Sequence, residues 1–138
     1  MQLALQRSSI RPWRMEDAVV GTVKFEPITD FCIEVNGAAV GGIGIHFGID
    51  VHRHTAELGY WLGEEFWVRG IMTEAVGAFS DFCFDTFSLR RIYAEPFANN
   101  RASARVLEKA GFVFEACLKN NVMKDGKLLD SLLYARTR

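Results

Sequence analysis

The segment "WVRGIMTEA" (67–75) places Gly70 at the start of a predicted helix, with the basic residue Arg69 beside it. A helix start presents unpaired N–H groups and about half a positive charge. A glycine at that point lets a ligand approach the backbone closely. Together these features are typical of a site that binds an anion, most naturally a phosphate. The alternative is that Gly70 only makes an ordinary turn between a strand and a helix.

A second predicted helix, in "NNRASARVLEKAGF" (99–112), also begins with polar residues, Asn100 and Ser103. Taken alone, this spacing favours a pair of helix-capping residues, and that alternative stays open. Both helix starts, however, follow a strand of the same predicted sheet, so two N–H-rich ends would lie on one edge of it. A long ligand with a phosphate end and an amide-bearing arm would fit between them.

Hydrophobic periodicity predicts the elements that must position these residues. Two segments have helical spacing, a main helix over 72–87 and a second from about Ala102 to a C-terminal cap at Gly111. Seven segments are strand-like, with the hairpin signal Asn36-Gly37 between the second and third: 3–10, 31–35, 38–47, 55–62, 90–96, 112–118 and 128–138. The main helix follows the fourth strand and the second helix follows the fifth. We therefore expect one α+β domain over residues 1–138, with a mixed, mostly antiparallel sheet of about seven strands.

Composition excludes several classes of protein. The chain has 138 residues and a net charge of −1, which fits one globular domain and does not suggest a non-specific nucleic-acid or membrane binder. No apolar run approaches the roughly 20 residues of a membrane helix, and the N-terminus does not resemble a signal peptide. Cys32, Cys83 and Cys117 lie far apart in apolar contexts, so we expect buried, inert thiols. These features together predict a cytoplasmic protein.

Two further motifs are weak. "GGIGIHFG" (41–48) begins like a dinucleotide-binding fingerprint, but Phe47 stands where the third glycine is required and no helix follows. A glycine-kinked strand explains it better. His46, His52 and His54 have no neighbouring cysteine or carboxylate that completes a metal set, so we expect solvated histidines and no metal site.

Four stretches resemble the GNAT acetyltransferases, and within them the RimJ/RimL branch (ribosomal-protein-alanine N-acetyltransferase-like), which acetylates protein N-termini and small amines. They are "IRPWRMEDA", "ELGYWLGEEFWVRGIMTEA", "AEPFANNRASARVLEKAGF" and "KDGKLLDSLLYA". The last three occur in order and at the family's spacing, from Glu57 to the C-terminus. The combination R-G-x-x-T-E-A with N-x-x-S-x-x-V-L-E-K-x-G-F is highly specific.

The resemblance implies a site for acetyl-CoA. Its pyrophosphate would lie on the backbone N–H groups of Arg69, Gly70, Ile71, Met72 and Thr73. Its pantetheine arm would pair like an extra strand with the backbone of Tyr60, Trp61 and Leu62, where such sheets splay open. Asn100 would bond the pantetheine, and Ser103 would lie near the thioester sulfur as a proton donor.

The remaining chemistry needs an oxyanion donor and a base. A backbone N–H near Leu62 suits the oxyanion. Glu57 lies on the strand where several GNAT enzymes keep a carboxylate base, although an ordinary surface glutamate is the alternative. Glu64 and Glu65 precede the phosphate site and look solvated.

The chain also departs from the family pattern. Trp67 stands where the family has Gln or Arg, and Met72 where it has Gly or Ala; because the site uses backbone N–H groups, we expect these changes to alter affinity more than binding mode. Only twelve residues separate Ala18 from Phe31, where the family has two helices. The N-terminal helix pair is therefore shortened or missing, which implies either an open acceptor site or a segment absent from this chain.

We interpret the chain as an acetyl-CoA-dependent N-acetyltransferase in which a primary amine attacks the thioester directly in a ternary complex. An α-amine is roughly one-tenth neutral at pH 7, whereas a lysine is neutral about four times in ten thousand. A protein or peptide N-terminus is therefore the favoured acceptor. The alternatives are a small amine (amino acid, polyamine or aminoglycoside-like) or a non-catalytic module that binds acyl-CoA or a partner protein. The open sheet edge suits a homodimer.

Overall fold

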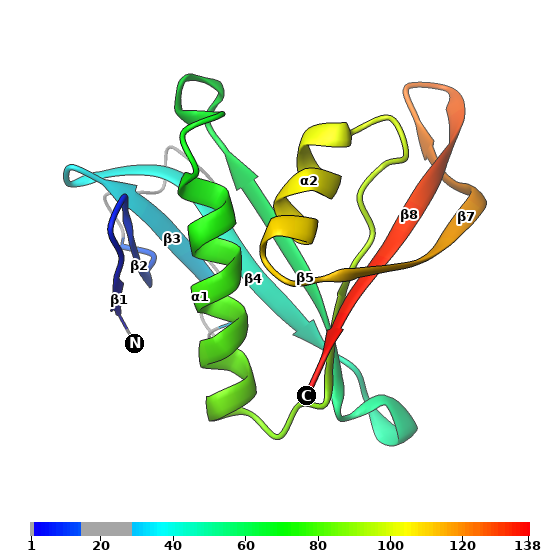
Figure 1. The fold of residues 1–138 in the computed structure, drawn as a ribbon, viewed down its shortest axis with the longest axis horizontal. Helices are drawn as coiled ribbons and strands as arrows, with labels where there is room; N and C mark the ends of the chain where they lie inside the picture. The colour runs from blue at the N-terminus through cyan, green and yellow to red at the C-terminus, as the bar shows by residue number, and fades with distance from the viewer. Residues whose placement is uncertain (1, 15–28) are drawn as a thin grey trace.

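Alternating and short apolar stretches build a single eight-stranded sheet in the computed structural model, which describes residues 2–14 and 29–138 (Figure 1). The strand order across the sheet is β1-β2-β3-β4-β5-β6-β8-β7. The strands are β1 Leu3–Ala4, β2 Ser9–Pro12, β3 Asp30–Val35, β4 Ala38–Phe47, β5 Thr55–Leu62, β6 Arg91–Ala94, β7 Val113–Lys124 and β8 Lys127–Thr137. The α-helices are α1 Ile71–Thr86 and α2 Arg101–Lys109, with short 3₁₀ turns η2 Asp50–His52 and η3 Glu64–Phe66.

The predicted α+β order is confirmed, and the strand count rises from seven to eight. The segment predicted as one strand over 3–10 is a hairpin, because the Leu5 N–H donates to the Ser8 carbonyl at 2.8 Å and reverses the chain between β1 and β2. The turn contains no Asn-Gly or Asp-Gly pair, so the sequence pattern did not predict it. The shortened N-terminal helix pair was predicted on the stretch between Ala18 and Phe31, most of which lies outside the described residues.

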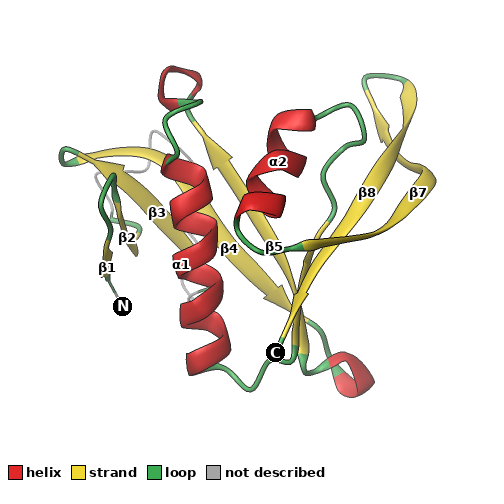
Figure 2. Ribbon diagram, viewed as in Figure 1, coloured by secondary structure: helices red, strands yellow, loops and turns green. Residues whose placement is uncertain are grey.

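Both α-helices pack on the same face of the sheet (Figure 2). The central contact is Phe79 of α1, which is fully buried and meets Phe31 of β3 edge-on with ring centroids 5.5 Å apart. From α2, Ala104 and Leu107 complete the same core. Burial of this apolar face, rather than helix propensity, holds both helices and so fixes where their N-termini point.

The sheet divides where β5 meets β6. These two strands are parallel and pair only through Thr55↔Arg91, Ala56↔Ile92 and Glu57↔Tyr93. Beyond that point β5 stays with β4 as far as the pair Gly41↔Leu62.

The chain after β6 follows β8 instead of β5. The Leu132 N–H donates to the Pro96 carbonyl, and the Ala98 N–H donates to the Asp130 carbonyl, both at 2.8 Å. A wedge therefore opens between β5 and the segment 94–98, on the side where both helices begin (Figure 1).

The thiols only partly match expectation. Cys32 and Cys83 are buried, and burial raises the pKa of the Cys83 thiol to about 12. The prediction of a buried Cys117 is wrong, because β7 is the edge strand of the sheet and Cys117 lies exposed on it. Neither helix in the described part of the chain is long and apolar enough to cross a membrane.

An ion pair between a buried arginine and a partly exposed glutamate fastens β2 to β3. Arg11 is 2% exposed, and its Nε donates to Glu34 Oε1 at 3.0 Å. The Ser9 hydroxyl donates to the other carboxylate oxygen of Glu34 at 3.0 Å. These hydrogen bonds, that from Arg11 first, lower the pKa of Glu34. The N-terminal hairpin is thus tied to the sheet by an interaction that depends on an ionised carboxylate.

We expect Glu34→Gln to lower the free energy of unfolding by about 2 kcal/mol at pH 7, because it weakens a charge-assisted bond to a buried guanidinium. The pKa of Glu34 is lower in the folded state. The wild-type advantage is therefore complete above the unfolded pKa of about 4.3 and disappears as the pH falls through the folded value. Urea unfolding at pH 7 and at about pH 3 measures both values. Equal differences at the two pH values would contradict the proposed role of the ion pair.

Candidate functional site

The backbone of β5 directs free amides into the wedge. The Gly63 N–H donates to the Val40 carbonyl and the Gly48 N–H to the Thr55 carbonyl, both at 2.8 Å. Hydrogen-bonded pairs alternate along an antiparallel ladder, so odd-numbered β5 residues bond β4 over this stretch. The amides of Tyr60 and Leu62 therefore point away from β4, toward the space that β6 leaves open. This is the edge at which a pantetheine arm was predicted to pair.

The first turn of α1 offers bare backbone, as predicted. Gly70 is the N-cap residue, with φ +76°, and no side chain of the described residues caps the helix start. Ile71 and Met72 turn their side chains into the core, where they are 3% and 8% exposed. Their N–H groups, with that of the half-buried Thr73, are what this helix start presents. The side chain of Arg69 lies over the Phe66 ring, 5.4 Å from its centroid.

The structure adds a cation to this helix start that the sequence pattern did not reveal. The Arg7 backbone N–H donates to Glu74 Oε1 at 2.9 Å, and its Nη1 donates to Glu74 Oε2 at 3.0 Å. A Cβ placed on Gly70 would lie 3.2 Å from Arg7 Nε. The two residues are far apart in sequence, and only the docking of the β1–β2 hairpin brings them together.

The loop before α1 reaches back to the wedge. The Trp67 indole N–H donates to the Leu62 carbonyl at 2.8 Å, so this departure from the family pattern covers the end of β5. The next residue, Val68, has φ +62° and is fully exposed. A β-branched residue in the left-handed region is strained, and such strain is often found at ligand sites.

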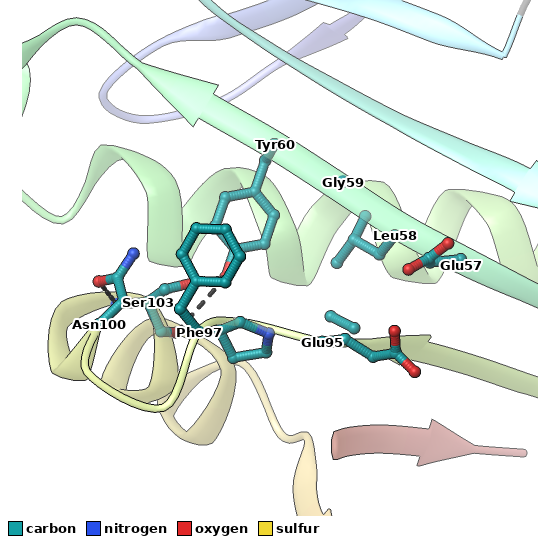
Figure 3. Close-up of a pocket in the computed structure, with 10 residues that line it drawn as sticks. Glu57, Leu58, Gly59, Tyr60, Glu95, Phe97, Asn100 and Ser103 are labelled. Atoms are coloured by element: carbon teal, nitrogen blue, oxygen red, sulfur yellow. Dashed lines mark hydrogen bonds between the residues drawn. The ribbon is translucent and has the colours of Figure 1, made fainter. Parts of the chain in front are cut away.

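At the start of α2, the alternative of a helix-capping role holds for Asn100, while its ligand role stays a prediction. Its Oδ1 accepts the Ser103 N–H at 3.1 Å, which leaves its NH₂ group as a donor for a ligand. The Ser103 hydroxyl turns toward β5, and its Oγ lies 2.6 Å from Tyr60 Oη (Figure 3). The capping role and the predicted ligand role of Asn100 therefore use different atoms of the same side chain.

These residues surround a cavity of about 300 Å³ in the wedge. Tyr60 enters from β5, Asn100 and Ser103 enter from the start of α2, and Glu57 lies at the point where β5 and β6 separate (Figure 3). Four of the predicted site residues thus meet around one cavity. The predicted anion-binding residues 69–73 do not line it; they lie at and just before the start of the neighbouring helix.

Glu95 lines the same cavity and was missed by the sequence analysis. Its burial, and then the charge of Glu57, raise its pKa. The available signal was its position: it precedes Pro96 at the end of the predicted strand 90–96, the parallel neighbour of the strand that carries Glu57. A pair of carboxylates with one raised pKa is an arrangement suited to proton transfer.

A second cavity, of about 500 Å³, lies beside β4 and β5, and Glu57 also lines it. Trp13 and Trp61 stack at its wall with ring centroids 6.3 Å apart. Both rings lie over Gly42, where a Cβ would come within 2.6 Å of Trp61 Nε1. His46, predicted as a solvated histidine, is exposed there. Within the described residues, no three His, Cys, Asp or Glu side chains cluster as metal ligands.

The wedge, the two helix starts and the strand order define a class of protein, and comparisons with known proteins agree. The Acetyltransferase (GNAT) domain family matches residues 10–113. This chain belongs to the GNAT acetyltransferases.

Its relatives include the ribosomal-protein N-acetyltransferases. The chain is 34% identical over 96 residues to the uncharacterized N-acetyltransferase YoaA of Bacillus subtilis, covering 70% of this chain and 54% of that protein. It is 35% identical over 88 residues to the ribosomal-protein-serine acetyltransferase of Escherichia coli, covering 64% and 49%.

A solved structure gives the same fold. RimL, a ribosomal L7/L12 alpha-N-protein acetyltransferase in complex with coenzyme A, matches with a TM-score of 0.72 and 27% identity, over 78% of this chain and 60% of RimL. The chain spans about half the length of the curated relatives it matches.

We expect acetyl-CoA to raise the melting temperature, and Gly70→Asp to abolish that rise, because it brings a negative charge to the bare helix start. The positive φ of Gly70 means that the variant also loses about 1 kcal/mol of stability without ligand, and does not keep the parent stability. Gly70→Asn is the matched control, since it has the same size and strain without the charge. An aspartate variant that responds to acetyl-CoA like the wild type would exclude this helix start as the pyrophosphate site.

Proposed function

We propose that this domain is an acetyl-CoA-dependent N-acetyltransferase whose acceptor is the α-amine of a peptide or protein N-terminus. The observation that carries the proposal is the wedge, where unpaired β5 amides, a hydroxyl pair and two carboxylates surround one cavity. Family membership and the coenzyme A bound to RimL support the choice of donor. Release of coenzyme A thiol in the presence of peptide amines is the direct test.

In this proposal acetyl-CoA lies along the wedge. Its pyrophosphate is bound by the N–H groups of Arg69 and Gly70 and of the first turn of α1, Ile71 to Thr73, with Arg7 close by. Its pantetheine amides pair with the backbone of Tyr60 to Leu62 and with the Asn100 side chain. The thioester then enters the cavity beside Ser103. The aligned N–H groups favour an anion at one end, and the open strand edge favours an amide-bearing arm at the other.

The reaction joins an amine nitrogen to the thioester carbonyl carbon and breaks the carbon–sulfur bond. While the tetrahedral intermediate exists, a β5 N–H that points into the wedge stabilises its oxyanion. Of the two such amides, that of Tyr60 lines the cavity, whereas that of Leu62 lies nearer the start of α1. As the intermediate collapses, the electron pair of the broken bond goes to sulfur and the Ser103 hydroxyl supplies a proton. The attacking nitrogen must also lose a proton, which requires a base on the acceptor side.

Glu57 and Glu95 together are the proposed base. Both line the wedge cavity, and Glu57 also lines the cavity beside Trp61, so Glu57 lies between the donor and acceptor sides with Glu95 on the donor side. Because its pKa is raised, Glu95 is a stronger base than an ordinary carboxylate. We therefore propose that Glu95 accepts the proton and that the negative charge of Glu57 raises its affinity for that proton.

The acceptor class follows from protonation and from space. With carboxylates as the only nearby bases proposed, an α-amine is far easier to deprotonate than a lysine. The 500 Å³ cavity, walled by Trp13 and Trp61, offers room and apolar surface for residues that follow the amine. The names of relatives that act on ribosomal proteins agree with a peptide acceptor.

We expect Glu95→Gln and Glu57→Gln to change the pH–rate profile differently. A base must be ionised, so the rate falls as the pH falls through its pKa. When kcat/KM is calculated for the neutral fraction of the amine, Glu95→Gln removes this acidic limb and lowers kcat/KM by roughly 100-fold. Glu57→Gln removes the like charge that raises the pKa of Glu95, so the limb remains but moves to lower pH. If Glu57→Gln alone removes the limb, Glu57 is the base, and two unchanged profiles would exclude both.

We expect a tetrapeptide with a free N-terminus to be acetylated more efficiently than its first residue alone. The peptide can bond the strand edge and contact the Trp13–Trp61 wall, whereas a single amino acid fills little of the cavity. The measurement is kcat/KM for both acceptors at one pH. An amino acid or polyamine that is better by tenfold, about 1.4 kcal/mol of transition-state binding, would move the substrate class to small amines.

A further inference from the structure

The two hydroxyl groups in the wedge form one contact. Tyr60 Oη lies 2.6 Å from Ser103 Oγ and 3.4 Å from the Ser103 carbonyl oxygen. The shorter distance is typical of a strong O–H···O hydrogen bond, whereas the longer one is at the limit of such bonds. The dominant partner of the phenol is therefore the serine hydroxyl. The sequence analysis assigned Tyr60 only a backbone role.

Both side chains are held in place by contacts outside the cavity. Tyr60 is half-buried against the core beneath the helices, and Ser103 belongs to the first turn of α2, where its N–H is fixed by Asn100 at 3.1 Å. Burial raises the pKa of Tyr60, although its bond to Ser103 acts in the opposite direction. The phenol is thus protonated at neutral pH and able to donate.

Which hydroxyl donates decides what Ser103 can do. A serine that donates to Tyr60 has no proton to offer a ligand in the cavity. A serine that accepts from Tyr60 keeps its own O–H, and this O–H must point elsewhere. The cavity lined by Asn100 and Ser103 is the open side of that hydroxyl.

We propose that Tyr60 is a positioning residue for Ser103: its phenol donates to Ser103 Oγ and so directs the Ser103 O–H toward the sulfur of the departing thiol. This inference rests on the proposed acetyltransferase function and on the role of Ser103 within it. It adds a requirement for a side chain of β5, on the opposite side of the wedge from α2.

The proton balance is complete without another reactant. As the carbon–sulfur bond breaks, its electron pair goes to sulfur, and the Ser103 proton forms the thiol. The Tyr60 proton passes to Ser103 Oγ, so the charge resides on a phenolate instead of an alkoxide. The phenolate regains a proton from water, and the proton lost by the amine leaves through the carboxylate pair. Because a phenol is a far stronger acid than an alcohol, this arrangement compensates for the weak acidity of serine alone.

The test is a double-mutant cycle on Tyr60→Phe and Ser103→Ala, with a short peptide as acceptor. We expect Tyr60→Phe to lower kcat about tenfold while KM for acetyl-CoA changes less than about twofold, since the lost bond matters most as the thiolate leaves. Once Ser103 is alanine, removing the Tyr60 hydroxyl should have almost no further effect, because the pair acts as a unit.

Tyr134→Phe is the matched control. Its hydroxyl also bonds α2, donating to Glu108 Oε2 at 2.8 Å, and it lies outside the proposed site. If loosening of α2 were the cause, this variant would lose as much activity as Tyr60→Phe. We expect its kcat to stay within about twofold of the wild type. Melting temperatures with and without acetyl-CoA show that each variant is folded and binds the donor.

Each outcome separates the two proposals. Wild-type activity with an unchanged Tyr60→Phe variant, or with additive losses in the double variant, overturns the role of Tyr60 and leaves the acetyltransferase function standing. Equal losses in Tyr60→Phe and Tyr134→Phe reduce Tyr60 to a packing residue. A wild-type protein that releases no thiol with any peptide or amine overturns the proposed function, and the role of Tyr60 with it.

Discussion

The parallel strands β5 and β6 separate after a short stretch of pairing, and the candidate site lies at the point where they separate. β5 and β6 pair for three residues, and then each follows a different antiparallel neighbour. Backbone groups in a sheet must find partners, and the β5 amides beyond Glu57 have lost theirs on one side. An opening in a sheet is unfavourable unless water or a ligand satisfies it. The wedge is therefore the place where an amide-bearing ligand has most to offer.

The two helix starts lie on either side of this opening, and their position beside it is what makes them candidate ligand-binding groups. α1 follows β5 and α2 follows β6, so each helix begins where one wall of the wedge ends. Their shared core with the sheet fixes these positions, with Phe79, Ala104 and Leu107 inside it. The result is a polar line from the bare amides after Gly70 to the capped turn at Asn100. In the proposed complex, the fold and not either helix alone would set the spacing between the phosphate at one end and the reactive carbonyl at the other.

The charged side chains are also separated along the wedge, with a cation at one end and two carboxylates at the other. Arg7, held by Glu74, stands beside the predicted anion site, and Glu57 and Glu95 stand at the opposite end, where an amine would approach. A cation near the phosphates and carboxylates near the amine each favour the expected ligand and disfavour the other. The hydroxyl pair Tyr60–Ser103 lines the same cavity as the carboxylates, beside the proposed position of the thioester sulfur.

Local sequence patterns were enough to predict most of the elements and the chemistry at the two helix starts. Periodicity predicted both helices, glycine predicted the bare start of α1, and the N-x-x-S spacing predicted the start of α2, because these are properties of neighbouring residues. It could not find the approach of Arg7 to Gly70, the bond between Tyr60 and Ser103, or the pairing of Glu95 with Glu57. Those contacts join residues tens of positions apart. The last two contacts exist because the chain after β6 follows β8 instead of β5, whereas the approach of Arg7 depends on the docking of the β1–β2 hairpin. Strand pairing of both kinds depends on the packing of the whole sheet.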